Sequence, residues 1–331
     1  MNAVVTGGGG FLGAAIVRQL AARGDRVLSI SRSHHSELDE LGVEQQSVDL
    51  RDPGAVHGAL RDADCVFHVA AKTDVWGARA DFEQTNVVGT KNVIEAARAA
   101  GTGRLVFTSS PSVCFDGKSH VNASNDLPYA ARFLSPYPET KARAERAVLA
   151  ANAGDLLTCA LRPHLIIGPG DPHLVPRLLA KAAAKKLAIV GPGDNEVSLT
   201  YVENAAHAHL CAADRLEPGA PHAGQAYFIA QLEPVQLWPW INTLLRRLDL
   251  APVTRRVPLG VARSAGALLE VIWRALRLDG EPPMMRFVAA QLATSHSYSM
   301  EPARRDFGYR EQVSLAEANE RLVQSLLAQR S

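Results

Sequence analysis

Cysteine, aromatic residues and excess charge are all scarce in this sequence of 331 residues. Only four cysteines occur, none in a C-x-x-C pair, which argues against a zinc site and a disulfide framework and favours a reducing, cytoplasmic location. The net charge of +1 gives no sign of a nucleic-acid partner. No apolar run reaches the length of a transmembrane helix, and no repeat or low-complexity tract is evident. No signal peptide is expected before the first strand.

Apolar residues, 47% of the chain, alternate between strand-like and helix-like stretches in the first half. Runs rich in β-branched residues predict strands, and the alanine-rich stretches between them predict helices. Such βαβ units imply a parallel sheet covered on both faces. The predicted strands are 2–6, 26–30, 43–48, 65–69, 105–108 and 157–161; the predicted helices are 11–23, 81–100 and one from the SPYPETK motif to about 153.

Prolines and glycines cluster after residue 162, which predicts loops around short elements. Helices are expected at 175–186, 203–215, 234–248 and 257–278, and a strand at 226–229 is expected to return to the sheet. The predicted fold class is α/β: a Rossmann doubly wound parallel sheet with a smaller, irregular, mostly helical C-terminal lobe. We assign 1–162 to an NADP-binding domain and 163–331 to a substrate-binding lobe, interleaved because segments near 190–230 rejoin the sheet.

The stretch VVTGGGGFLG joins the first predicted strand to the first helix. Glycines at this spacing allow a tight turn and let backbone N–H groups approach a pyrophosphate, while the helix N-terminus adds partial positive charge. A lone motif is weak evidence, but the strand before it and the helix after it support binding over a turn that binds nothing. We expect Gly7, Gly10, Phe11, Leu12 and Gly13 to hold the cofactor.

The end of the second predicted strand, VLSISRS, indicates which cofactor binds. An NAD site usually carries an acidic residue there, whereas an arginine suits the 2′-phosphate of NADP. Ser31 stands at the place of the acid and Arg32 follows, and a guanidinium forms strong hydrogen bonds with phosphate. The pair predicts NADP(H). The alternative is that Arg32 is only a solvated surface charge.

The motif SPYPETK places Tyr137 four residues before Lys141, a spacing that none of the other five tyrosines shares. On a helix these two side chains share one face. An ammonium near a phenol lowers the phenol pKa, so Tyr137 is a candidate proton donor to a carbonyl oxygen. The alternative is an ordinary pair on a helix surface.

The fifth predicted strand ends in TSSPSV, and the ends of parallel strands face the ligand crevice. A hydroxyl there is placed to polarise a substrate oxygen. Ser110 is the preferred candidate, with Ser109 and Ser112 as alternatives, because serines also serve as plain turn residues. No metal site is expected: His207 and His209 are two residues apart and do not share a helix face.

These motifs, with VDL, FHVAA, NVVGT and LRPHLIIGPGD, resemble the extended short-chain dehydrogenase/reductases. TYVENAAHAH and ARRDFGYREQVSLAEA are similar to the 3β-hydroxysteroid dehydrogenase-like branch of that family. The resemblance implies a catalytic set of Ser110, Tyr137 and Lys141, and a homodimer paired through the catalytic helix. It also implies cofactor contacts from Asp49 and Leu50 beside adenine, Ala70 and Ala71 along the cofactor, Asn86 supporting the site, Pro163 against nicotinamide, and Tyr137 and Lys141 themselves.

A narrower resemblance rests on AAKTDVWG, LVPRL and GEPPMMRF. These are similar to bacterial β-keto acid reductases of long-chain olefin biosynthesis. That resemblance implies NADPH-dependent reduction of a large hydrophobic 2-alkyl-3-oxoalkanoic acid to the 3-hydroxy acid, which passes to a β-lactone-forming partner enzyme. The alternatives are a 3β-hydroxysteroid or sterol dehydrogenase, a nucleotide-sugar epimerase, and an NADP-sensing protein without catalysis.

Residues 257–278 carry apolar side chains at a helical period, among them Val261, Leu268 and Leu276. Two interpretations stay open: the helix walls an apolar substrate pocket, or it packs on the core. His164, beside Pro163, has no interpretation from the sequence.

Overall fold

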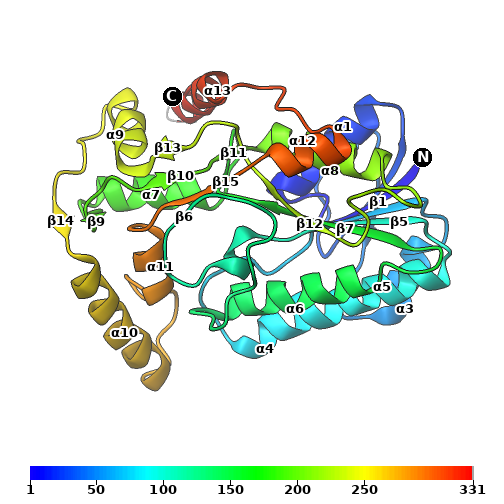
Figure 1. Ribbon diagram of the computed structural model, residues 1–331, viewed down its shortest axis with the longest axis horizontal. Coiled ribbons are helices and arrows are strands. Elements are labelled where there is room, and N and C mark those ends of the chain that lie inside the picture. The colour runs from blue at the N-terminus through cyan, green and yellow to red at the C-terminus, as the bar shows by residue number, and fades with distance from the viewer. Residues whose placement is uncertain (330–331) are drawn as a thin grey trace.

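The computed structural model describes residues 1–329, and a sheet of seven parallel strands lies at its centre (Figure 1). The strand order is β12-β7-β5-β4-β1-β2-β3, so the direction of winding reverses between β1 and β4. In a doubly wound sheet the ligand crevice opens at this point, beyond the carboxyl ends of the strands. The predicted Rossmann fold class is confirmed. The strands are β1 (Asn2–Thr6), β2 (Arg26–Ser31), β3 (Glu44–Ser47), β4 (Cys65–His68), β5 (Arg104–Thr108), β7 (Leu157–Pro163) and β12 (Ala226–Ile229).

Helices cover both faces of this sheet (Figure 1). On one face α1 (Phe11–Ala22) packs against α8 (Val202–Asp214), with α12 (Glu301–Phe307) beside β12. On the other face lie α3 (Pro53–Leu60), α5 (Gly89–Ala99) and α6 (Pro136–Ala150). Alternate strand residues supply the two cores, with Val5 on the first face and Val4 on the second. Burial on both faces explains why the strands are continuously apolar in sequence.

The C-terminal half is less regular, as predicted, but it contains elements that the sequence did not indicate. The strand predicted at 226–229 is β12, and it pairs with β7. Several strands are only two residues long and pair across large sequence separations, so no local pattern marks them. The division into two domains stays a prediction.

The strands outside the central sheet are β6 (His120–Ala123), β8 (Ile166–Ile167), β9 (Ile189–Val190), β10 (Glu196–Val197), β11 (Thr200–Tyr201), β13 (Val235–Gln236), β14 (Arg256–Val257) and β15 (His296–Tyr298).

Helices make up most of the rest of this half. The predicted helices 175–186, 234–248 and 257–278 correspond to α7 (Leu174–Ala183), α9 (Leu237–Arg247) and α10 (Leu259–Ala275). Three further helices, α11 (Arg286–Gln291), α12 and α13 (Leu315–Ala328), were not predicted. In the first half the shorter helical segments are α2 (Ser36–Asp39), α4 (Arg79–Phe82), the π-helix η1 (Glu83–Val88) and the 3₁₀ turn η2 (Pro111–Cys114).

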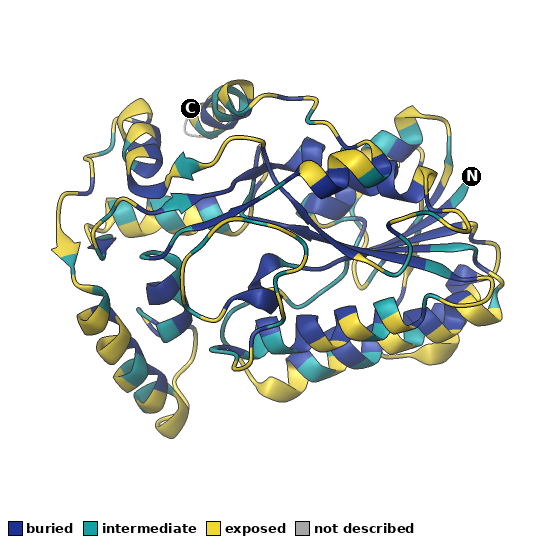
Figure 2. Cartoon of the chain, in the orientation of Figure 1, coloured by how far each residue is buried: buried dark blue, intermediate teal, exposed yellow. Residues whose placement is uncertain are grey.

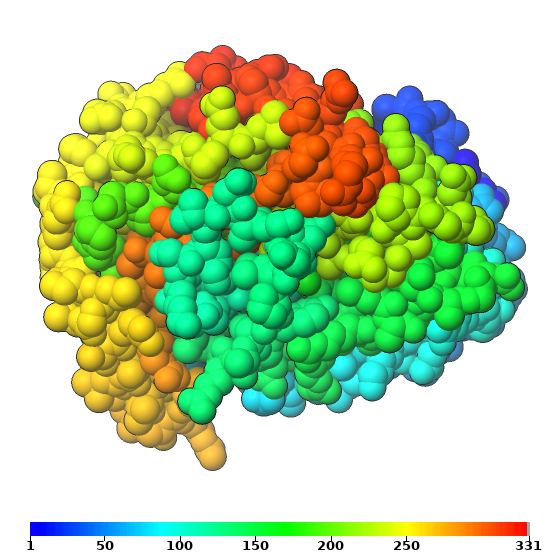
Figure 3. Space-filling model, viewed as in Figure 1, coloured from blue at the N-terminus to red at the C-terminus, as the bar shows by residue number. Residues whose placement is uncertain are grey.

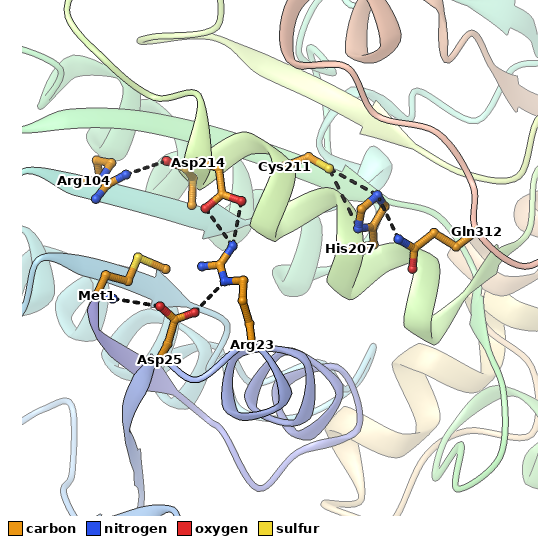
Figure 4. Close-up of polar contacts among 9 residues, drawn as sticks. Met1, Arg23, Asp25, Arg104, His207, Cys211, Asp214 and Gln312 are labelled. Carbon is orange, nitrogen blue, oxygen red and sulfur yellow. Dashed lines mark hydrogen bonds and ion pairs between the residues drawn. The ribbon is translucent and has the colours of Figure 1, made fainter.

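Ion pairs close the amino end of the sheet (Figure 4). The amino group of Met1 lies 2.8 Å from Asp25, which also pairs with Arg23 at 2.6 Å. Arg23 reaches on to Asp214 at the end of α8, at 2.6 Å. These contacts tie β1, α1 and α8 together at the end of the sheet away from the crevice.

Helix α10 projects from the body of the protein, and many of its residues are exposed (Figure 2). Val261, Leu268 and Leu276 are 59%, 62% and 66% exposed. They do not line the main cavity, so the structure does not support the interpretation of 257–278 as a wall of that pocket. The helix does pack on the protein, but through Ala262, which joins a small core cluster with Val190 and Ala289, and not through these three side chains. Within residues 1–329, no helix combines the length and the apolar character that crossing a membrane requires.

Candidate active site

A cavity of about 580 Å³ opens beyond the carboxyl ends of the central strands. The glycine turn lies at one part of its wall, and residues from the ends of β5 and β7 and from α6 complete it. Lys141 and Asn86 are the two predicted site residues that do not line it. The predicted residues that do are Gly7, Gly10, Phe11, Leu12, Gly13, Ser31, Arg32, Asp49, Leu50, Ala70, Ala71, Ser110, Tyr137 and Pro163.

The glycine turn has the shape of a phosphate cradle. Gly7 adopts a φ of +68°, and a Cβ there would lie 3.0 Å from the Cα of Ala70. A Cβ on Gly13 would lie 2.0 Å from the carbonyl oxygen of Gly7, so only glycine lets α1 pass this close to the turn. No side chain caps the N-terminus of α1 at Gly10. The N–H groups of its first turn are therefore available to an anion, and the cradle fits a dinucleotide pyrophosphate.

Two arginines line the part of the cavity where the sequence predicts the adenosine end of the cofactor. Arg32 is exposed at the cavity wall beside Ser31, whose hydroxyl donates to the carbonyl oxygen of Ser33 at 2.5 Å. Arg51, which sequence reasoning missed, also lines the cavity and holds Asp49 through both carboxylate oxygens. This pairing with Arg51 lowers the pKa of Asp49 to about 2. The nearby carboxylate is therefore already neutralised, which leaves net positive charge at this end.

Helix α6 begins at the SPYPETK motif because Ser135 caps it. The Ser135 hydroxyl accepts from the N–H of Tyr137 at 3.4 Å and donates to the carbonyl oxygen of Val75 at 2.7 Å, while Pro136 starts the first turn. This places half-buried Tyr137 at the cavity wall.

The serine candidates lie at the end of β5. The Ser110 hydroxyl accepts from the N–H of Ser112 at 3.2 Å and contacts the Ser112 hydroxyl at 2.9 Å. Ser109 and Ser110 line the cavity and Ser112 does not. The structure therefore places Ser110 and Tyr137 on one cavity wall, with Ser112 behind them.

Lys141 lies behind the cavity wall and not in it. It is 2% exposed; its ammonium donates to the carbonyl oxygen of Thr108 at 2.5 Å and lies 4.0 Å from the centre of the Phe107 ring. Burial lowers the pKa of Lys141 to about 7, and the charge of Glu145 acts in the opposite direction.

The expected lowering of the Tyr137 pKa is not found in this structure. Burial raises the pKa of Tyr137, and only its interaction with Ser110 opposes that shift. The physical reason is that the Lys141 ammonium is directed to the Thr108 carbonyl, within the sheet, and not to the phenol.

A buried ion pair supports this wall, and sequence reasoning missed it. Arg162 donates to both oxygens of Glu145, at 2.9 and 2.6 Å, and both side chains are buried. Although burial opposes ionisation, these hydrogen bonds lower the pKa of Glu145. Glu145 lies one turn after Lys141, and Arg162 directly precedes Pro163. The i, i+4 spacing from Lys141 was the signal available in the sequence.

Asn86 holds two segments together behind the cavity. Its side chain accepts from the N–H of Lys72 at 2.8 Å and donates to the Lys72 carbonyl at 3.1 Å. It also donates to Thr140 on α6 at 3.1 Å. The predicted supporting role agrees with these contacts, whereas the predicted cofactor contact does not, because Asn86 lies outside the lining. The surrounding π-helix is a departure from regular α-helix that is common near functional sites.

Two buried histidines brace the strand ends. His68 lies 2.8 Å from the Thr6 hydroxyl and 2.9 Å from that of Thr90. Burial, with the charge of Lys141, lowers the pKa of His68 to about 3. His164 contacts His296 on β15 at 2.6 Å, and burial lowers its pKa as well. Both histidines are therefore neutral structural links, which accounts for His164 beside Pro163.

The chain is similar to known proteins over nearly its whole length. The model of the 3-beta hydroxysteroid dehydrogenase/isomerase family matches residues 4–259. The chain is 50% identical over 330 residues to the 2-alkyl-3-oxoalkanoate reductase of Stenotrophomonas maltophilia (strain K279a), covering 99% of this chain and 100% of that one. It is 38% identical over 326 residues to the sterol-4-alpha-carboxylate 3-dehydrogenase, decarboxylating, of Mus musculus, covering 97% and 90%. The crystal structure of gox2253 shares the fold, with a TM-score of 0.80 at 24% identity, covering 99% and 98%.

Proposed function

Because the chain belongs to the 3-beta hydroxysteroid dehydrogenase/isomerase family, whose members are oxidoreductases acting on hydroxyl or keto groups, we propose that it reduces 2-alkyl-3-oxoalkanoic acids with NADPH. The product is the 2-alkyl-3-hydroxyalkanoic acid of long-chain olefin biosynthesis. The observation that carries the proposal is that Ser110 and Tyr137 line the same cavity as the glycine turn.

Each part of the site has a task in this reaction. The bound nicotinamide supplies hydride chemistry. The Ser110 hydroxyl binds the ketone oxygen of the substrate, and Tyr137 donates its proton to that oxygen. The family resemblance assigns Lys141, one helical turn after Tyr137, to the same catalytic set. Its amine, with a pKa of about 7, is held by the Thr108 carbonyl and does not contact the phenol. Leu165, which also lines the cavity, gives its wall an apolar side chain suited to an alkyl chain.

The names of two relatives describe one substrate pattern. A 2-alkyl-3-oxoalkanoate has its ketone on the carbon next to the one that bears the carboxylate. A sterol 4-carboxylate that is dehydrogenated at carbon 3 has the same arrangement. The identity of 50% over the whole chain favours the open-chain acid, and the sterol carboxylate is the second candidate.

A turnover assay tests the proposed reaction. Purified protein is supplied with NADPH and a 2-alkyl-3-oxoalkanoic acid, a 3-oxo sterol or a nucleotide sugar. We expect oxidation of NADPH with the first, and a loss of kcat of about 100-fold to 10,000-fold in Tyr137→Phe with NADPH binding retained. Turnover of the nucleotide sugar alone would overturn the proposed substrate, and full activity in Tyr137→Phe would remove the tyrosine from the mechanism.

The choice of NADP(H) is tested at Arg32. Loss of a charge-assisted hydrogen bond to the 2′-phosphate should weaken NADPH binding in Arg32→Ala by about 10-fold to 100-fold and leave NADH binding unchanged. Arg26→Ala is the matched control, since Arg26 is exposed at the start of β2, whereas Arg32 directly follows the end of that strand. Equal losses for both nucleotides would contradict the assignment.

The proposal also includes two partners. The chain forms a homodimer through α6, and its product passes to a β-lactone-forming enzyme. Sedimentation analysis tests the dimer.

A further inference from the structure

Helix α10 presents an apolar face to solvent. Val261, Leu268, Val271 and Leu276 are each more than half exposed. The steps of seven and eight residues from Val261 to Leu268 and from Leu268 to Leu276 place these side chains on one side of the helix. The space-filling view shows this segment projecting at the edge of the molecule (Figure 3). Single exposed leucines are common on proteins, but a row along one helix marks an interaction surface.

The other side of α10 is firmly attached to the protein. Ala262, Gly266 and Glu270 are its buried residues. A Cβ on Gly266 would lie 2.8 Å from the backbone nitrogen of Arg286, so the helix makes backbone-to-backbone contact there. Glu270 accepts from that nitrogen at 2.8 Å and pairs with the Arg286 guanidinium at 2.7 Å. The exposed apolar row therefore belongs to a helix whose orientation is set from its opposite side.

The charges of this segment are basic on the outside. Residues 254–278 contain five arginines and a single acidic residue, Glu270, which is buried and paired. The exposed charges of residues 254–278 are thus all basic, and the acidic residues Asp279 and Glu281 follow only after this segment. The excess of arginine opposes pairing with the same segment of a second copy and favours an anionic surface. The arginines are Arg255, Arg256, Arg263, Arg274 and Arg277.

The same helix is connected to the active site. Arg274 lies over the ring of Trp76, 4.9 Å from its centre. Three residues earlier, Thr73 lines the cavity, and Val75 accepts the hydrogen bond from the Ser135 cap of α6. One short segment therefore joins the cavity wall, the start of α6 and α10.

We propose that α10 docks the protein onto an anionic lipid bilayer surface. The apolar row enters the boundary between headgroups and acyl chains, and the arginines meet lipid phosphates. At 17 residues the helix lies on the surface and does not cross it. The docking stands independently of the proposed reaction, although it would bring the cavity wall close to lipid-like substrates.

Vesicle cosedimentation without substrate or cofactor tests the docking. The full chain should bind phosphatidylcholine vesicles that contain phosphatidylglycerol, and bind poorly to pure phosphatidylcholine or at high salt. Leu268→Glu with Val271→Glu should weaken binding by about 10-fold or more, since both side chains would have to leave water. Arg263→Gln with Arg277→Gln should weaken it by about fivefold for each arginine.

Val121→Glu is the matched control, because Val121 is 63% exposed on β6 and lies outside α10. It should bind vesicles as the unaltered chain does. No vesicle binding by the unaltered chain, or equal binding by the Leu268→Glu/Val271→Glu variant, overturns the proposal. The proposal is also overturned if the Leu268→Glu/Val271→Glu variant loses self-association and keeps vesicle binding. That result would assign the apolar row of α10 to contact with a second copy of the chain. A catalytically inactive chain that still binds vesicles separates failure of the proposed reaction from failure of the docking.

Discussion

Helices α6 and α10 depart from the usual distribution of side chains in opposite directions. Helix α6 buries two charged residues, Lys141 at 2% exposure and Glu145 at 0%. Helix α10 leaves Leu268 and Val271 at 62% and 61% exposure. Lysine and glutamate are seldom fully buried, and leucine and valine usually are. Burying the charges of α6 and exposing the apolar side chains of α10 both cost free energy, and the need to form a helix explains neither.

The groups in contact with the two buried side chains of α6 set the pKa of each. Glu145 has a guanidinium beside it, which lowers its pKa and keeps it ionised. Burial lowers the pKa of Lys141 to about 7 although the charge of Glu145 opposes this, because the direct contacts of its amine are a carbonyl and an aromatic ring, and neither is an anion. One turn of a single helix therefore holds a permanently charged group and a group that titrates near neutral pH. The second property suits a site that moves protons.

The largest expected effect is on activity when α6 loses its buried ammonium. Lys141→Met should lower kcat by about 100-fold or more, because the proposed catalytic set loses its titratable amine, one helical turn from the proposed proton donor. Stability should stay the same or rise, since a buried charge without an anionic partner is replaced by an apolar chain of similar length. Turnover assays and urea unfolding measure the two quantities. Lys91→Met, at an exposed position of α5, is the control. Unchanged activity in Lys141→Met would separate the lysine from the chemistry.

The next effect concerns the ion pair beneath the site. Glu145→Gln leaves the Arg162 charge buried without its carboxylate, and should lower the free energy of unfolding by about 3–5 kcal/mol. Glu139 is the matched control, because it lies on the same helix and pairs with Arg79 at the surface. Glu139→Gln should cost less than about 1 kcal/mol. If Glu145→Gln and Glu139→Gln lose similar unfolding free energies in urea, burial does not make the Glu145–Arg162 pair more important to stability than the surface Glu139–Arg79 pair.

The pH dependence of stability sharpens the comparison further. The pKa of Lys141 is about 7 in the folded chain and 10.5 in its ordinary state. Between these values the unfolded chain binds a proton that the folded chain does not, so the folded state gains stability as pH rises. The free energy of unfolding of the unaltered chain, relative to Lys141→Met, should rise by up to about 1.4 kcal/mol per pH unit above pH 7. Below pH 7 the difference should be constant, and a flat profile throughout would contradict the buried, neutral amine.

The sequence was informative wherever local chemistry decides the structure. The glycine turn, the Ser135 cap and strands such as β1 and β12 follow from residues within a few positions of one another. Tyr137 and Ser110 were predicted for the same reason, since a strand end and a helix start point into one crevice.

Sequence reasoning was less successful where long-range packing decides. The direction of the Lys141 side chain depends on the Thr108 carbonyl, 33 residues away, and the partner of Glu145 lies on β7. The apolar period of α10 resembled that of a core helix. Only its neighbours in space show that its small residues, with Glu270, face the protein.

The smallest expected effect is on the stability of α10, and it decides which side of that helix belongs to the fold. Leu268→Glu should change the free energy of unfolding by no more than about 0.5 kcal/mol, because the side chain contacts mainly water. Gly266→Ala, two residues earlier on the attached side, should cost about 1–3 kcal/mol, because its Cβ would meet the backbone of Arg286. Thermal and urea unfolding at several protein concentrations measure both. A large loss of unfolding free energy in Leu268→Glu that depends on protein concentration would mean that a second copy covers the apolar row. The row would then serve the stability of a dimer and not lipid binding.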